Sequence, residues 1–420
     1  MKKKDLKNVI IIFGMSILAF FACNEKNDVI SESASGRTDF LISTEFSDSA
    51  EACGVMESFR IRKYDTLYIE SSVNEKNRKN FRLFLGYFND YETAARKGLQ
   101  LVFDSTLSDF DVFSNGEIQN NYLRNFYFVG KYLDRPALVK YDLVKKKKTL
   151  IWSPWGRKII TFLQSDDLVN SYFITVYRIG NKVSFPFMTK VKIYHFNRED
   201  EAVNDIEFLG KNQRIQAEWT ARDTFRVMLT SLDSIYTSIV YRKTFKYLSN
   251  GTRVFSDSLK FNLLRDGYPS FPRKEAELTS PNRQYKIVSM SDTTGVNYQL
   301  FNLTSASFIA LDSLAGRIAE VKWDELNKRV YIVTFPDDSV TDTSLLYGFD
   351  IARNEKILNV ERPGNVTLSF FGPALFYDYG KGDKKSIRIY DVNNRRDYSE
   401  IKVKGGCGIN SINMVEDTGK

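Results

Sequence analysis

The chain has one histidine and three cysteines, which limits the chemistry that its side chains can perform. The histidine, His195, follows Tyr194 near the end of an expected strand, where a structural role is the stronger interpretation. Hydrolases that use imidazole as a base also need a nucleophile and an orienting group, and zinc sites of His and Cys need several ligands. We therefore expect neither kind of site and predict no cofactor.

The N-terminus carries the pattern of an export signal. Residues 1–22 combine a basic start, an apolar run of 13 residues from Val9 to Phe21, and Ala22 before Cys23. A membrane-spanning helix, the alternative, needs about 20 apolar residues. The segment Phe20-Phe21-Ala22-Cys23 resembles the lipobox of bacterial lipoproteins, with Phe20 in place of the usual Leu, a variant of Bacteroidetes-type envelopes. The resemblance implies a signal peptide over 1–22 and a lipid on Cys23 that anchors the protein in the envelope, in the outer membrane on its periplasmic or surface side.

The charge of the chain does not indicate nucleic-acid binding. Residues 1–22 carry four Lys and one Asp, so the formal charge of +8 becomes 8 − 3 = +5 after their removal. Basic and acidic residues alternate along the chain, which favours a solvated surface of mixed charge. The one basic run, residues 145–148, is expected at the tip of a hairpin.

Two cysteines remain if Cys23 is lipidated. In an oxidising compartment Cys53 and Cys407 could form a disulfide, because one precedes the expected repeats and the other follows them. Spacing alone does not show that the two Cα atoms approach each other. The alternative is two buried, unpaired thiols.

The rest of the chain divides into a tether and an all-β domain. Residues 23–55 are polar and irregular, which predicts a lipidated Cys with a flexible tether. Over 56–420, apolar and polar residues alternate in short runs, which predicts strands, for example at Thr66–Glu70, Arg124–Val129, Tyr172–Tyr177, Tyr285–Ser289, Arg329–Val333 and Ser386–Tyr390. Tyr91–Lys97 could form a short helix.

A repeat appears when each strand that ends in an aromatic before a turn is marked. Subtracting the residue numbers of successive marks gives spacings of 53, 53, 53, 54, 48 and 41. Repeats of about 40–50 residues with four strands each are typical of β-propeller blades. We expect a β-propeller of four-stranded blades, with seven favoured and six as the alternative, from marks at Phe88-Asn89, Tyr141-Asp142, Tyr194-His195, Tyr247-Leu248, Phe301-Asn302, Phe349-Asp350 and Tyr390-Asp391.

Two segments carry a family resemblance. Thr279–Val288, with Ser280-Pro281-Asn282-Arg283, is similar to the strand-turn of TolB-like and WD-type propellers, and Leu138–Leu143 is similar to their third strand. Asn282-Arg283 replaces the usual Asp-Gly, and the only Trp-Asp pair closes a first strand instead of a third. The resemblance implies a toroid with a binding surface on one face and no particular chemistry.

Three further patterns have structural alternatives. Gly405–Gly408 lacks the residues of a phosphate loop, and Pro336-Asp337-Asp338 fits a turn better than a metal site. Asp followed by Ser or Thr and then an apolar or Thr residue recurs and resembles an O-glycosylation acceptor sequence of Bacteroidetes exported proteins, although ordinary turn chemistry is the stronger interpretation. The Asp residues of this pattern are Asp48, Asp65, Asp104, Asp233, Asp257, Asp312 and Asp338.

These observations favour a non-catalytic binding or scaffolding propeller that holds a protein or glycan. The alternative is a glycan lyase or hydrolase that uses Tyr, Arg and carboxylates, for which the sequence nominates no catalytic residue.

Overall fold

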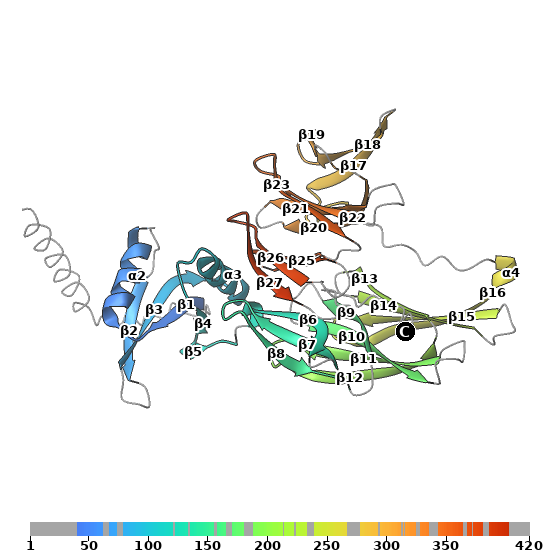
Figure 1. Ribbon diagram of the computed structural model, residues 1–420, viewed down its shortest axis with the longest axis horizontal. Coiled ribbons are helices and arrows are strands. Elements are labelled where there is room, and N and C mark those ends of the chain that lie inside the picture. The colour runs from blue at the N-terminus through green and yellow to red at the C-terminus, as the bar shows by residue number, and fades with distance from the viewer. Residues whose placement is uncertain are drawn as a thin grey trace, which may run out of the picture. The chain divides into compact units, whose positions relative to one another are not determined.

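The structure is a computed structural model. It describes residues 40–61, 67–73, 79–120, 122–132, 135–154, 158–164, 170–179, 188–212, 214–221, 224–232, 239–266, 278–292, 295–311, 314, 316–324, 328–335, 343–363, 368–371, 373–380 and 386–402. The chain forms two compact units, which divide between Arg124 and Asn125 (Figure 1).

Unit 1 contains a five-stranded antiparallel sheet and two helices of 13 residues each. The strand order is β2-β3-β1-β4-β5, so the first strand lies in the centre of the sheet. Helix α3 begins after Asp90, whose side chain accepts a hydrogen bond from the N–H of Thr93. The bounds are β1 Phe40–Phe46, α2 Ser49–Ile61, β2 Leu67–Val73, β3 Lys79–Phe88, α3 Tyr91–Phe103, β4 Asp111–Ser114, β5 Glu117–Ile118 and the 3₁₀ helix η1 Tyr122–Arg124.

Unit 1 corrects the predicted boundary between tether and β domain. Strand β1 and the first half of α2 fall within 23–55, and Ile42 and Ala52 are fully buried there. The expected short helix at Tyr91–Lys97 continues to Phe103. The chain is therefore mostly β rather than all-β, and the part of the predicted tether from Phe40 onward is folded.

Gly98 in α3 gives a mutational prediction. A Cβ at this position would lie 2.8 Å from Cγ of Phe110 and closer still to two other carbons of that buried ring. We expect Gly98→Ala to lower the free energy of unfolding by about 1–3 kcal/mol, because overpacking outweighs the gain in helix propensity. Gly54→Ala in α2 is the matched control. Nothing lies within 4 Å of the added Cβ there, so this variant should gain about 1 kcal/mol. Urea unfolding measures both, and stabilisation by Gly98→Ala would contradict the packing.

The described residues of unit 2 form six antiparallel sheets of three or four strands, each built from consecutive strands. We number them sheets 1 to 6 in chain order. Sheet 1 contains β6 Asn125–Tyr132, β7 Arg135–Asp142 and β8 Lys147–Trp152, and sheet 2 contains β9 Lys158–Gln164, β10 Asn170–Ile179, β11 Met188–Asn197 and β12 Val203–Asn212. Sheet 3 contains β13 Arg214–Ala221, β14 Thr224–Leu232, β15 Ile239–Leu248 and β16 Arg253–Asn262, and sheet 4 contains β17 Tyr285–Asp292, β18 Gly295–Asn302 and β19 Ser307–Ala310. Sheet 5 contains β20 Arg317–Asp324, β21 Arg329–Phe335, β22 Thr343–Asp350 and β23 Glu355–Pro363, and sheet 6 contains β24 Leu368–Phe371, β25 Ala374–Tyr379, β26 Ser386–Asp391 and β27 Arg396–Lys402. The short helix α4, Leu263–Asp266, follows β16.

The repeat marks are confirmed in these six sheets with one shift and one exception. Five marks end β7, β15, β18, β22 and β26, the strand before the last in each sheet. In sheet 2 that strand, β11, ends at Phe196-Asn197, two residues after the predicted Tyr194-His195. The first mark, Phe88-Asn89, ends β3 in unit 1 and therefore lies outside the repeat.

The predicted strand-turn at Thr279–Val288 is confirmed. The Ser280 N–H donates to the carbonyl of Tyr285, and the Ser280 Oγ accepts from the Tyr285 N–H at 2.9 Å. Arg283 in this turn has a φ of 56°, a left-handed backbone conformation that glycine adopts more readily than other residues.

Several pairs of consecutive sheets pack against each other through their apolar faces. Sheet 1 packs against sheet 2 through Tyr127 and Phe196, and sheet 2 against sheet 3 through Tyr172 and Phe225. Separate apolar clusters join sheet 4 to sheet 5 and sheet 5 to sheet 6.

The last sheet also packs against the first. The rings of Phe126 and Phe376, both buried, stack with their centroids 4.0 Å apart. The Lys148 ammonium donates to the carbonyl of Lys402 at 2.6 Å. The end of unit 2 thus returns to its beginning.

Candidate functional site

The turns that follow the marked strands share one construction. In five of the six sheets, an Asp or Asn side chain accepts hydrogen bonds from backbone N–H groups two or three residues later; these residues are Asp142, Asn197, Asn302, Asp350 and Asp391. Four residues after each of them stands one with positive φ: Lys146, Glu201, Ala306, Asn354 and Arg395. Sheet 3 has Leu248 at the first position and uses Gly251, with a φ of 84°, in its turn. Side-chain acceptors and a left-handed residue together fix such a turn.

We call these turns, residues 142–146, 197–201, 248–251, 302–306, 350–354 and 391–395, the turn rim. Its polar groups connect neighbouring sheets. Glu201 of sheet 2 accepts hydrogen bonds from the Tyr127 hydroxyl at 3.0 Å and from the Lys140 ammonium at 2.7 Å, both in sheet 1. Tyr172 of sheet 2 donates to the carbonyl of Ser249 in sheet 3.

The rim continues across sheets 5, 6 and 1. The Arg395 guanidinium donates to both oxygens of Glu355 at 2.8 and 2.6 Å, and this lowers the pKa of the Glu355 carboxyl. The Tyr398 hydroxyl donates to the carbonyl of Leu143 at 3.2 Å, with the Lys146 ammonium over its ring. Burial raises the pKa of Tyr398 to about 12. The basic run 145–148 thus forms the predicted hairpin, and two of its lysines also contact sheet 6.

Three buried tyrosines predict an alkaline loss of stability. Burial raises the pKa of Tyr127, Tyr247 and Tyr331, and the Glu201 and Glu207 carboxylates raise the first two further. Above pH ~10 the unfolded tyrosines ionise while the folded ones keep their protons. The free energy of unfolding should therefore fall with rising pH by about 1.4 kcal/mol per pH unit for each such tyrosine.

Urea unfolding between pH 8.5 and 11.5 tests this expectation. In the variant Tyr331→Phe the free energy of unfolding should fall less steeply with pH, by about 1.4 kcal/mol per pH unit, because one buried tyrosine is missing. A wild-type free energy of unfolding that stays constant over this pH range would contradict the burial of these hydroxyls.

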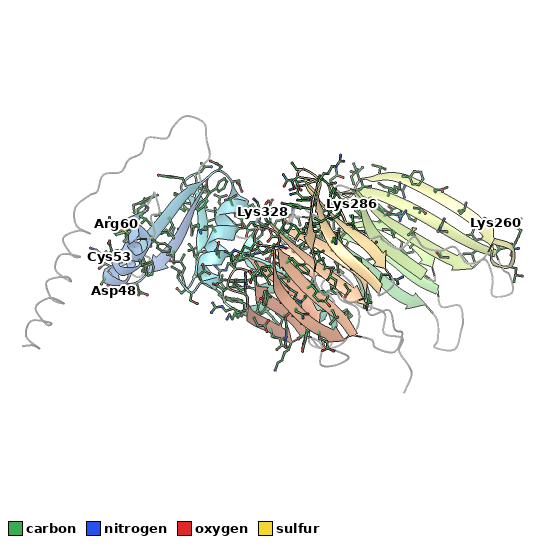
Figure 2. The ribbon with its side chains drawn as sticks, turned by 90° about the horizontal axis from the view of Figure 1, so that it is seen from above. Asp48, Cys53, Arg60, Lys260, Lys286 and Lys328 are labelled. Carbon is green, nitrogen blue, oxygen red and sulfur yellow. The ribbon has the colours of Figure 1, made fainter. Side chains whose placement is uncertain are left out.

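The structure describes some of the sequence-predicted residues and leaves others outside the described part of the chain. Cys23 and Cys407 lie outside the described residues, as do Gly405–Gly408 and Pro336-Asp337-Asp338. Cys53 lies on α2 between Asp48 and Arg60 and is disulfide-bonded (Figure 2). His195 lies within β11, and its ring is 5.1 Å from that of Tyr172.

Two of the recurrent Asp-Ser/Thr sites lie at helix ends. The Asp48 carboxylate accepts from the Ala50 N–H at 3.0 Å just before α2 begins, and Asp104 caps the end of α3. Turn chemistry therefore accounts for both. A third site, Asp257-Ser258, is exposed on β16. Asp65, Asp233, Asp312 and Asp338 lie outside the described residues.

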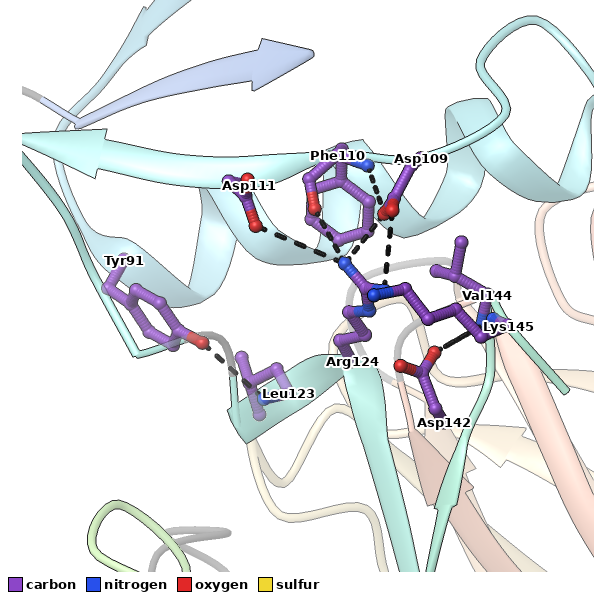
Figure 3. Close-up of polar contacts among 9 residues, drawn as sticks. All are labelled: Tyr91, Asp109, Phe110, Asp111, Leu123, Arg124, Asp142, Val144 and Lys145. Atoms are coloured by element: carbon purple, nitrogen blue, oxygen red, sulfur yellow. Dashed lines mark hydrogen bonds and ion pairs between the residues drawn. The ribbon is translucent and has the colours of Figure 1, made fainter. Parts of the chain in front are cut away.

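An ion-pair cluster in unit 1 was not predicted. The buried Arg124 guanidinium lies 2.6 Å from Oδ1 of Asp109 and 3.9 Å from Oδ1 of Asp111, and donates to the carbonyl of Phe110 at 3.2 Å (Figure 3). Burial raises the pKa of the Asp111 carboxyl, and Asp109 raises it further while Arg124 lowers it. The cluster ties η1 to the start of β4. Asp109 and Asp111 stand two positions apart at the start of β4, and this spacing is the only sequence signal for the cluster.

Metal-binding groups and membrane-spanning helices are two further features that would indicate a function. In the described part of the chain, no group of three or more His, Cys, Asp or Glu residues could hold a metal ion. None of the helices described is long and apolar enough to cross a membrane.

Comparison with known proteins gives only distant matches. No known protein family matches the chain, and no curated protein sequence does. TolB from Acinetobacter baumannii is 11% identical with a TM-score of 0.41, covering 82% of this chain and 81% of TolB. A chain of a nidogen–laminin complex is 10% identical with a TM-score of 0.36, covering 68% of this chain and 96% of its own length.

A prolyl endopeptidase is 10% identical with a TM-score of 0.35; the match covers 73% of this chain and 51% of that protein, about half its length. The chain is a mostly β protein of small antiparallel sheets, with a distant structural similarity to TolB, nidogen and prolyl endopeptidase.

Proposed function

We propose that the chain is a lipid-anchored protein of the bacterial cell envelope. Its second unit would be a six-bladed β-propeller that binds or scaffolds a protein or glycan partner without catalysis. The first unit, with its helices and central β1, would lie between the anchor and the blades in sequence.

The cyclic packing of unit 2 supports the propeller. Five of the six contacts that a closed ring of these sheets needs are present, including the one from sheet 6 back to sheet 1. A single small sheet buries too little apolar surface to be stable alone, and a ring buries both faces of each. The six described sheets of unit 2 and the place of Phe88 in unit 1 support six blades rather than seven.

The turn rim and the residues beside it support a binding platform. Glu201 and Arg395 of the rim, with Glu355 and Tyr398 next to it, take part in hydrogen bonds that join neighbouring sheets. Groups held in this way make a rigid platform, and binding residues generally lie on loops positioned by such a scaffold.

The signal-like N-terminus supports the anchor. Cys23 precedes the first residue of β1, Phe40, by 40 − 23 = 17 positions. A lipid on Cys23 with this spacer would hold the folded units at the membrane surface.

Expression in a lipoprotein-competent host tests the anchor. The intact mass should show a cleaved, diacylated Cys23, and globomycin should cause the precursor to accumulate. Cys23→Ser should abolish both effects, and an unmodified Cys23 in the wild type would contradict the proposal.

A turnover screen tests the absence of catalysis. The chain from residue 24 onward keeps every described residue. It should leave a broad panel of glycans and peptides unchanged, and reproducible turnover of any of them would overturn the non-catalytic assignment.

A further inference from the structure

The outer edge of sheet 3 differs from a normal solvated sheet edge. Strand β16 is the last strand of this sheet and pairs with β15 alone among the described strands; we call its other backbone edge, which has no partner among those strands, the open edge. Residues 253–260 of the strand are exposed, with Val254 at 53%, Phe255 at 46% and Leu259 at 46%, and Leu264 in α4 is 88% exposed. An open edge with exposed apolar side chains is a template for another strand.

The last strands of the other sheets keep shorter unbroken registers with their neighbours. Strand β12 is interrupted by two register shifts against β11, β8 and β27 keep four residues in register on one side of a shift, β23 keeps six, and β19 has four residues in all. Bulges and short lengths are the usual devices that prevent edge pairing. The single shift of β16 lies near its beginning, and Phe255–Asn262 then keeps an unbroken register of eight residues with β15.

The charge of this hairpin selects its partner. Residues 239–266 contain six basic residues and two acidic ones, a net charge of 6 − 2 = +4, and one of the basic residues, Arg253, pairs with Glu207 of β12. On one face, Phe255 stands opposite Lys246, whose ammonium lies over its ring, and Leu259 stands opposite Arg242. Lys260 stands opposite Tyr241, on the other face. A second copy of this chain would bring two +4 hairpins together, which like-charge repulsion disfavours.

We propose that β16 is a docking edge for an acidic, extended segment of a partner protein, which adds to sheet 3 as a fifth strand. Main-chain hydrogen bonds along the open edge would supply affinity, and apolar residues of the segment would cover Phe255 and Leu259. Its carboxylates would face Arg242, Lys246 and Lys260. This surface goes beyond the proposed function, because it depends neither on the lipid nor on closure of the ring. Figure 2 shows Lys260 at the free end of sheet 3.

A labelled peptide of alternating Val and Glu residues is the probe, with fluorescence anisotropy on the full chain without its signal as the readout. We expect saturable binding that weakens with salt and is lost when alternate residues of the peptide are N-methylated, because methylation removes the hydrogen bonds of one edge. The variant Leu259→Lys should weaken binding at least tenfold although it adds positive charge.

The matched control is Phe208→Lys on β12, where Phe208 is 51% exposed on the outer strand of sheet 2. It makes the same change of charge and should leave the affinity unchanged, with circular dichroism confirming that both variants fold. The proposal would be overturned if the peptide did not bind at millimolar concentrations of the chain, or if the N-methylated peptide bound equally well. It would also be overturned if Leu259→Lys and Phe208→Lys changed the affinity equally. Binding to vesicles of anionic phospholipid without binding of the peptide would overturn it as well.

Discussion

Replacing Phe376 with alanine is expected to lower the free energy of unfolding of unit 2 by about 3–5 kcal/mol. Its ring is fully buried and stacks on Phe126, 250 positions earlier in the sequence (376 − 126 = 250), at a centroid distance of 4.0 Å. The substitution leaves a cavity at the contact between the first and last sheets, where the proposed ring of sheets would close. Urea unfolding monitored by fluorescence measures the loss.

Phe308→Ala on β19 is the control, because this phenylalanine is exposed and its loss should change stability by less than about 0.5 kcal/mol. A double-mutant cycle of Phe126→Leu and Phe376→Leu separates direct contact from general packing. Stacked aromatic pairs give coupling energies of about 0.5–1.5 kcal/mol. Two variants whose effects simply add would show that these sheets do not meet.

Loss of the disulfide at Cys53 is the second large effect. The chain has three cysteines, and Cys53 is disulfide-bonded. A sulfur that carries a thioether-linked lipid cannot also form a disulfide. If Cys23 is lipidated, Cys407 is therefore the only cysteine of the chain left for Cys53. We expect Cys53→Ser and Cys407→Ser each to lower the free energy of unfolding by about 2–5 kcal/mol, as loss of a native disulfide does.

The three serine variants together decide the pairing. The double variant Cys53→Ser/Cys407→Ser should be no less stable than either single variant, since both remove the same bond. Cys23→Ser should remove the lipid and leave the stability unchanged. A loss of stability in Cys23→Ser that matches Cys53→Ser would assign the disulfide to Cys23 and would refute the lipid anchor.

The sequence predicted the strands and their repeat because both are local patterns. Alternating residues such as Tyr172–Tyr177 and Arg329–Val333 lie in β10 and β21, as predicted. The mark in sheet 2 was misplaced because Tyr194 and Phe196 are two aromatics on one face of β11. Asn197, the side-chain acceptor of the turn, distinguishes the correct position.

Unit 1 and the contacts between sheets depend on information that is not local. Helix α2 does have apolar residues at helical spacing, at Ala52, Val55, Met56 and Phe59, but Gly54 and the polar segment before them obscured the pattern. The order β2-β3-β1-β4-β5 cannot be inferred from chain order, because β1 joins two later strands. The Arg124 cluster and the Phe126–Phe376 stack join residues that no periodicity relates.

Chemical crosslinking tests the closure of unit 2 most directly. The Lys148 ammonium lies 2.6 Å from the carbonyl of Lys402, and both residues are exposed. A short amine-reactive reagent followed by mass spectrometry should link Lys148 to Lys402 within one chain, with a mixture of ¹⁴N- and ¹⁵N-labelled protein to identify links between chains. If links form within the basic run of residues 145–148 but none reaches Lys402, the last sheet does not pack on the first, and the closed ring is wrong.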